Sequence, residues 1–237
     1  MIRLLLALCV AVAQVATQPA PSVITTARIS PDGQSIAFAR QSADRVPLGL
    51  FKITIAGQDE MQVAPPDGVV SDVTWSPAAD AIAYVSRPST DAAARVRVVP
   101  ATGGAPQTID PSTPPFPLLP KPLAPPEPIV DVPDAQILFI TPVGADRQAL
   151  TLSNGKETWI VLASTTGTRL TVMRPGVARI VEPPSWSDDG KWFAVLASPR
   201  AGEHPEIFAG SLPRPQPKGI NVGAAPPMVR QLTGVKP

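Results

Sequence analysis

Three stretches of the chain repeat one pattern: a large apolar residue, a serine, four or five turn-forming residues, and then a short apolar run. They are residues 29–38, 75–84 and 186–195, which align without a gap. Ser and Asp bond to nearby backbone, Pro presets φ for a turn, and Gly tolerates positive φ. A short apolar run after such a turn is typical of a buried strand. Each phrase therefore predicts a hairpin, and its recurrence predicts a repeat fold.

The spacing of the phrases indicates the blades of a β-propeller. Ser30 and Ser76 are 46 residues apart, close to the length of one four-stranded blade. A weaker fourth copy runs from Leu152 and Ser153 to Trp159. The 77 residues from Ser76 to Ser153 include residues 111–134, where ten of 24 residues are proline. Without that insertion 53 residues are left, again close to one blade, and the 34 residues from Ser153 to Ser187 fit a trimmed blade.

Proline makes up 32 of the 237 residues, which argues against long helices because proline removes a backbone donor and clashes within a helix. We therefore expect an all-β chain, a partial β-propeller of about four four-stranded antiparallel blades. The predicted blades are residues 23–72, 73–150, 151–183 and 184–237. The Pro-rich insertion at residues 111–134 is interpreted as a surface loop, with a polyproline II excursion or semi-rigid linker as the alternative.

The first residues predict a secretory signal peptide. Residues 1–3 give a positive start, residues 4–12 are apolar, and small residues follow at about residue 13, as a signal peptidase requires. The apolar run is shorter than the roughly 20 residues of a membrane span. Residues 1–22 are therefore assigned to a signal peptide and short linker. Cys9, the sole cysteine, would be removed together with the signal peptide. A mature chain without disulfides favours a bacterial periplasmic or secreted protein.

Charge and composition exclude several functions. Twenty basic and nineteen acidic residues are scattered along the chain, whereas a nucleic-acid binder usually shows a basic stripe. One histidine, His204, and one cysteine do not suffice for a Cys/His zinc site or a two-histidine metalloprotease motif. We expect no cofactor, no metal, no nucleic-acid partner and no membrane span after signal removal.

The sequence predicts no catalytic residue. A serine hydrolase needs a Gly-x-Ser-x-Gly elbow and an adjacent base, and Gly33-Gln34-Ser35 followed by Ile36 comes nearest. His204 is interpreted as a solvated loop residue. The other candidates are interpreted as structural. We expect Asp188-Asp189-Gly190 to form a turn rather than a calcium loop, and Gly103-Gly104 to form a turn rather than a phosphate loop. Trp75 and Trp186 are interpreted as blade-packing residues rather than stacking platforms, and the arginines Arg95, Arg97, Arg200 and Arg214 as solvated side chains. Binding residues are left unassigned.

The phrase Ser30-Pro31-Asp32-Gly33 resembles the WD40-like (PD40) repeat of TolB-type β-propellers. It is similar also to the N-terminal propeller of S9-family serine peptidases, the prolyl oligopeptidase and dipeptidyl peptidase group. Gly103-Gly104 after a strand, and Gln231-Leu232-Thr233 in a closing strand, fit the same families. The resemblance covers about residues 23–237. It marks turns rather than a site, so it implies a fold more than a function.

The chain departs from these families in two respects. Ala78-Ala79 replaces the Asp-Gly of the motif, and Asp188 stands where Pro is usual. The families have more blades than the four expected here, and an incomplete ring leaves open strand edges that invite pairing. We interpret the chain as the N-terminal part of a longer protein. A self-associating half-propeller and a closed four-blade ring are the alternatives.

Two functions follow from these observations. The first is an exported β-propeller scaffold or binding module for protein or peptide partners, without catalysis of its own. The second is the N-terminal substrate-gating propeller of a secreted S9-like serine peptidase whose catalytic domain is absent from this chain. In either case the open blade edges allow self-association.

Overall fold

The computed structural model describes residues 22–110, 134–164, 169–212 and 229–233. These residues form four antiparallel sheets, and no helix occurs among them. The predicted signal peptide lies outside the described residues, as does all of the Pro-rich insertion except Asp134. No helix in the described part of the chain has the length and apolar character that crossing a lipid bilayer requires.

Each sheet is one blade, and its strands follow one another in the sequence. Blade 1 consists of β1 (Ser22–Ile29), β2 (Ser35–Ser42), β3 (Pro47–Thr54) and β4 (Met61–Ala64). Blade 2 consists of β5 (Val69–Trp75), β6 (Ala81–Arg87), β7 (Arg95–Pro100) and β8 (Gln107–Ile109). Blade 3 consists of β9 (Gln136–Val143), β10 (Arg147–Ser153), β11 (Thr158–Ser164) and β12 (Arg169–Met173). Blade 4 consists of β13 (Arg179–Ile180), β14 (Ser185–Trp186), β15 (Trp192–Ser198), β16 (Glu206–Ser211) and β17 (Val229–Gln231). The four blades confirm the predicted all-β partial propeller.

The three repeated phrases form equivalent hairpins held by a serine and an aspartate. Ser30 Oγ donates to Asp32 Oδ1 at 2.5 Å and accepts from the backbone N–H of Ser35 at 3.0 Å. The corresponding Ser–Asp distances in the other two turns are 2.6 Å for Ser76–Asp80 and 2.7 Å for Ser187–Asp189. All three serines are buried. Each side chain thus satisfies backbone groups that the turn would otherwise bury without a partner.

Blade 3 is organised differently from the prediction. The turn after Ser153 joins β10 to β11, whereas the three repeated phrases form the turns between β1 and β2, β5 and β6, and β14 and β15. The equivalent turn of blade 3 lies at residues 143–147, between β9 and β10, where no serine holds the turn. The predicted boundary after residue 150 falls inside β10, and that after residue 183 falls between β13 and β14, which both pair with β15.

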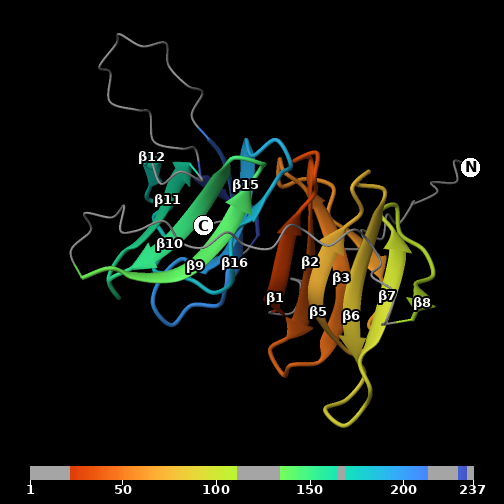
Figure 1. The fold of residues 1–237 in the computed structure, drawn as a ribbon. Helices are drawn as coiled ribbons and strands as arrows, with labels where there is room; N and C mark the ends of the chain where they lie inside the picture. Colours follow the sequence, from red (N-terminus) through yellow and green to blue (C-terminus); the bar gives the residue numbers. More distant parts are fainter. Residues whose placement is uncertain (1–21, 111–133, 165–168, 213–228, 234–237) are drawn as a thin grey trace, which may run out of the picture.

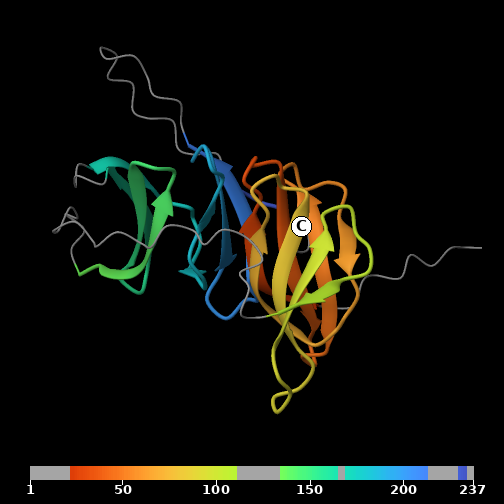
Figure 2. The ribbon, with the colours of Figure 1, turned by 45° about the vertical axis from the view of Figure 1, so that its right-hand side comes forward.

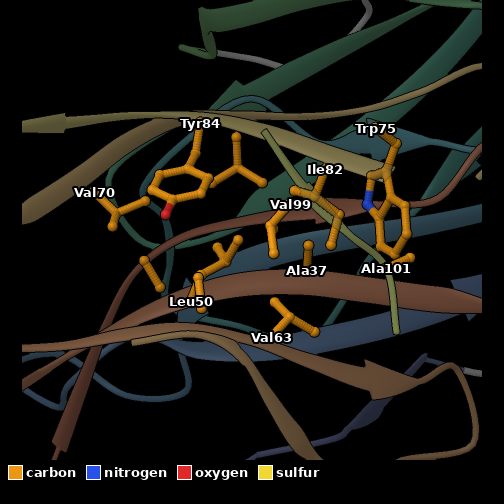
Figure 3. Packing of buried hydrophobic residues seen from close by; sticks show 12 residues of the cluster. Ala37, Leu50, Val63, Val70, Trp75, Ile82, Tyr84, Val99 and Ala101 are labelled. Carbon is orange, nitrogen blue, oxygen red and sulfur yellow. The ribbon is translucent and has the colours of Figure 1, made fainter. Parts of the chain in front are cut away.

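Three buried clusters join the blades in the order 3–4–1–2 (Figures 1 and 2). Ile160 and Leu162 of blade 3 pack with Phe193 of blade 4. Blade 4 then packs on blade 1 through a second cluster that includes Phe38 and Ile207. The third cluster joins blade 1 to blade 2, and Figure 3 shows its side chains meeting between the two sheets. Since blade 4 lies beside blade 1, the ring is interrupted between blades 2 and 3.

The junction between blades 4 and 1 contains hydrogen bonds as well as apolar contacts. The backbone N–H of Asp188 donates to the carbonyl of Pro31 at 2.8 Å, which ties the turn of blade 4 to the turn of blade 1. Glu182 accepts from the backbone N–H of Ala27 at 2.6 Å and pairs with Arg28 at 3.0 Å. No buried cluster joins blades 2 and 3 among the described residues, so these residues do not form a closed four-blade ring.

Tyr84 lies in the cluster between blades 1 and 2 (Figure 3), and its hydroxyl has no hydrogen-bond partner among the described residues. The pKa of this hydroxyl is raised, mainly by burial. The Arg97 charge opposes the rise, and the Asp67 charge adds to it. A buried hydroxyl without a partner costs free energy that a ring without it does not incur. We expect Tyr84→Phe to leave the free energy of unfolding unchanged or to raise it by up to about 1 kcal/mol, as measured by urea denaturation.

The matched variant for this prediction is Asp67→Ala. It removes the carboxylate that pairs with Arg97 and leaves that guanidinium, 16% exposed, without compensation. We expect this second change to lower the free energy of unfolding by about 2 kcal/mol. A loss of similar size in Tyr84→Phe would show that the hydroxyl has a partner.

Candidate functional site

The two faces of blade 2 differ in burial. On the face toward blade 1, Val70, Ile82, Tyr84 and Val99 are at most 7% exposed. The other face, called here the outer face, presents apolar side chains that belong to none of the buried clusters. Its residues are Val69, Ser71, Val85, Arg87, Val96, Val98, Gln107 and Ile109. Val69 is 47% exposed, and the three other valines and Ile109 are partly exposed.

The strand register places these side chains side by side. Val85 is opposite Ser71 on one neighbouring strand and opposite Val96 on the other, and Val96 is opposite Ile109. Directly opposite residues of antiparallel strands project from the same face. One row of side chains therefore crosses all four strands of the blade. The outer face is thus a sheet surface of branched apolar residues that lacks the neighbouring blade a propeller would normally supply.

A pocket of about 410 Å³ lies at one end of the outer face. It is formed where β5 begins and β6 ends, and its lining residues are Val69, Ser71, Val85, Arg87, Ser89 and Thr90. Ser71 Oγ donates to Asp72 at 2.9 Å. The Arg87 side chain is exposed and forms no ion pair or hydrogen bond with any residue in the described ranges. The pocket thus combines an apolar wall with one uncompensated cation and three hydroxyl groups.

Blade 3, on the other side of the interruption, does not offer a comparable surface. Its side chains that face away from blade 4 include Leu150, Trp159 and Val161, which are at most 4% exposed. Among the blade 3 side chains whose burial is described, the exposed large apolar ones are Ile137 and Leu138, beside the irregular register of β9. Of the two blades that border the interruption, blade 2 therefore carries the accessible apolar face.

The structure separates the residues that the sequence singled out. His204 is exposed in the loop between β15 and β16. Trp75 is buried and donates from Nε1 to the carbonyl of Arg28 at 3.0 Å, across the blade 1–blade 2 junction. Trp186 packs on Phe193 with ring centroids 5.1 Å apart. None of these three side chains lies on the outer face of blade 2.

The remaining candidates are turn and ion-pair residues. Asp188, Asp189 and Gly190 form the turn before β15, and the described residues contain no group of three or more metal-ligating side chains. Gly103 and Gly104 follow β7 with positive φ. The interpretation of Arg97 as solvated is wrong, since it pairs with Asp67 and Ser86 hydrogen-bonds to the same carboxylate. Arg95 is exposed, Arg200 lies 3.4 Å from Glu203, and Arg214 and Cys9 lie outside the described residues.

Asp189 gives the turn of blade 4 a defined pH response. Burial raises the pKa of this carboxyl, but hydrogen bonds from Lys191 and Ser187 and the Lys191 charge lower it from 3.8 to about 2. The ionised form therefore stabilises the fold, fully above about pH 4 and progressively less as the pH falls to about 2. We expect the difference in free energy of unfolding between the wild type and Asp189→Asn to shrink over this range.

The size of that difference is limited because the Asp189 side chain is 48% exposed; we expect less than about 1 kcal/mol at pH 6. Denaturant unfolding at several pH values measures it. Asp146→Asn is the control, since its carboxylate is 84% exposed and has a single 3.6 Å contact to Arg147. A difference for Asp189→Asn that does not change between pH 6 and pH 2 would contradict the prediction.

Comparison with known proteins finds solved structures of similar fold but low sequence identity. No family model and no curated protein matches the sequence. Among solved structures, an oligogalacturonate lyase in complex with manganese is 12% identical, with a TM-score of 0.35 over 82% of this chain and 52% of the lyase. A putative TolB from Agrobacterium tumefaciens is 16% identical, with a TM-score of 0.25 over 82% of this chain and 59% of that one. The propeller domain of the Trilobed protease from Pyrococcus furiosus is 12% identical, with a TM-score of 0.31 over 78% and 54%. The chain thus spans little more than half the length of each of these proteins.

Proposed function

We propose that the chain is an exported binding module that docks a protein or peptide partner on the outer face of blade 2. The observation that carries this proposal is the contrast between the two faces of one sheet. On the face toward blade 1, Val70, Ile82, Tyr84 and Val99 are at most 7% exposed, whereas the opposite face keeps Val69 47% exposed beside four partly exposed branched residues. Association removes such apolar surface from water at a gain of roughly 25 cal/mol per Å².

The form of the surface favours a partner that is itself extended or sheet-like. Propeller blades pack face to face, as blades 1 and 2 do through Leu50 and Ile82 (Figure 3). The outer face offers the same kind of pleated apolar surface. A segment laid along it would bury alternate side chains between the rows of blade 2. The proposal assigns the chain no chemistry of its own.

Site-specific photo-crosslinking tests this proposal. Benzoylphenylalanine is placed at Val96, in the middle of the outer face, and the full chain is irradiated in its native host. The matched control carries the same group at Asp44, an exposed residue between β2 and β3 on blade 1. We expect a discrete adduct from position 96 and none from position 44. Circular dichroism of both purified variants verifies that the sheets are intact.

Three outcomes would overturn the proposal. Adducts of equal yield from positions 96 and 44 would show unspecific contact, and a lack of adducts from position 96 would show that the face has no partner. An adduct of twice the mass of the chain would identify a second copy as the occupant and would replace the partner proposal with self-association. The second hypothesis from the sequence, the gating propeller of a serine peptidase, stays a prediction.

A further inference from the structure

Arg87 is one of the arginines in the described ranges whose side chain has no carboxylate partner. Six arginines are paired with carboxylates: Arg28, Arg40, Arg97, Arg147, Arg174 and Arg200. Arg87 has no such partner in the described ranges, although Asp91 lies in the loop that follows it. It is also the only charged residue that lines the pocket. Within the part of the chain that the structure describes, the outer face therefore presents one uncompensated positive charge at the edge of an apolar surface.

The spacing along β6 fixes where a complementary charge must lie. Val85 and Arg87 are two residues apart on the same strand, so both project from the outer face, about 6.6 Å from each other along the chain. Val69 is directly opposite Arg87 and forms the apolar floor beside the guanidinium. An extended partner segment repeats its side chains with the same period. An apolar residue placed over Val85 thus puts the residue two positions away over Arg87.

We propose that the outer face of blade 2 recognises an extended peptide segment in which Asp or Glu stands two residues from a branched apolar residue, with the carboxylate paired to Arg87. This inference rests on the proposed function and names the chemistry of its partner. The apolar residue would pack on Val85 and Val96. The guanidinium presents a planar fork of N–H donors that matches a carboxylate. The hydroxyls of Ser89 and Thr90 at the pocket rim could donate to the same group.

The test repeats the crosslinking at position 96 in three further backgrounds. Arg87→Glu reverses the charge in the pocket, and Arg87→Lys keeps it. Arg95→Glu is the matched control because Arg95 is an exposed arginine of the same blade whose side chain projects from the opposite face. We expect the adduct yield to fall at least about tenfold in Arg87→Glu, because like charges brought together oppose binding. It should stay within about threefold in Arg87→Lys and be unchanged in Arg95→Glu. Each variant is expected to fold, since Arg87 and Arg95 form no contact that holds the sheet.

The outcomes separate this inference from the proposed function. An adduct whose yield is the same in Arg87→Glu as with the native arginine would overturn the charge pairing while the docking face stands. Equal losses in Arg87→Glu and Arg95→Glu would also overturn it, because they would reflect net charge rather than the pocket. Tandem mass spectrometry of the cross-linked partner peptide supplies an independent readout. An Asp or Glu two residues from a branched apolar residue near the cross-link supports the inference, and its absence or a phosphorylated residue in its place contradicts it.

Discussion

Phe38→Ala is expected to lower the free energy of unfolding by about 3–5 kcal/mol. The ring is fully buried between blades 1 and 4, where it stacks on Phe51 with centroids 5.8 Å apart. Truncation leaves a cavity that two packed sheets cannot close, so the loss includes both the transfer of the ring and the empty volume. Urea denaturation followed by circular dichroism measures the change. The size of the loss measures how closely blade 1 packs on blade 4.

Val98→Ala on the outer face of blade 2 is the matched control. Its side chain is partly exposed and belongs to no buried cluster, so we expect a loss of less than about 1 kcal/mol. Equal losses in Phe38→Ala and Val98→Ala would contradict the blade order 3–4–1–2. They would mean that the outer face is as closely packed as the junction between blades 1 and 4.

Glu182→Ala is expected to destabilise the same junction by about 2–3 kcal/mol. The carboxylate accepts hydrogen bonds from the backbone N–H of Ala27 at 2.6 Å and from Thr26 Oγ1 at 3.1 Å, and it pairs with Arg28 at 3.0 Å. With its side chain only 16% exposed, its removal leaves the buried Ala27 N–H and Thr26 hydroxyl without partners. Unsatisfied buried donors cost about 1–3 kcal/mol each. Urea denaturation again gives the measurement.

Glu203→Ala serves as the control for this change. Glu203 is 44% exposed and lies 3.4 Å from Arg200 in an exposed loop, so its replacement should cost less than about 0.5 kcal/mol. If Glu182→Ala were no more destabilising than Glu203→Ala, the carboxylate would not hold β1 to blade 4.

The turns of the fold could be predicted from the sequence because their chemistry is local. Ser30 and Asp32 act within six residues of the chain, and the same short-range bonds recur at Ser187 and Asp189. Even the departure at Ala78 has a local explanation, since Asp80 supplies the missing carboxylate from two residues further on. The weaker fourth copy falls in a different hairpin, because the turn Ser153-Asn154-Gly155 follows the same local chemistry between β10 and β11.

The arrangement of the blades depends on contacts that no local pattern contains. Glu182 contacts Ala27, which is 155 residues away in the sequence, and Arg97 pairs with Asp67, which is 30 residues away. The outer face of blade 2 has the same origin. Strand β6 reads as a continuous apolar run, which predicts burial on both faces, and only the packing shows that no described blade covers one of them. The sequence alone therefore gives no sign of a partly exposed Val85 next to Arg87, which has no carboxylate partner in the described ranges.

The junction between blade 4 and blade 1 also sets the order of events during synthesis. Ala27 leaves the ribosome about 155 residues before Glu182, the group that satisfies its N–H. At ordinary elongation rates of 5–20 residues per second, this delay is about 8–30 s. Blade 1 can pack on blade 2 during that time, but the sheet surface around Phe38 stays in water until the strands of blade 4 have been synthesised. Such a surface is prone to aggregate, and chaperone dependence should therefore concentrate on blade 1 rather than on blade 4.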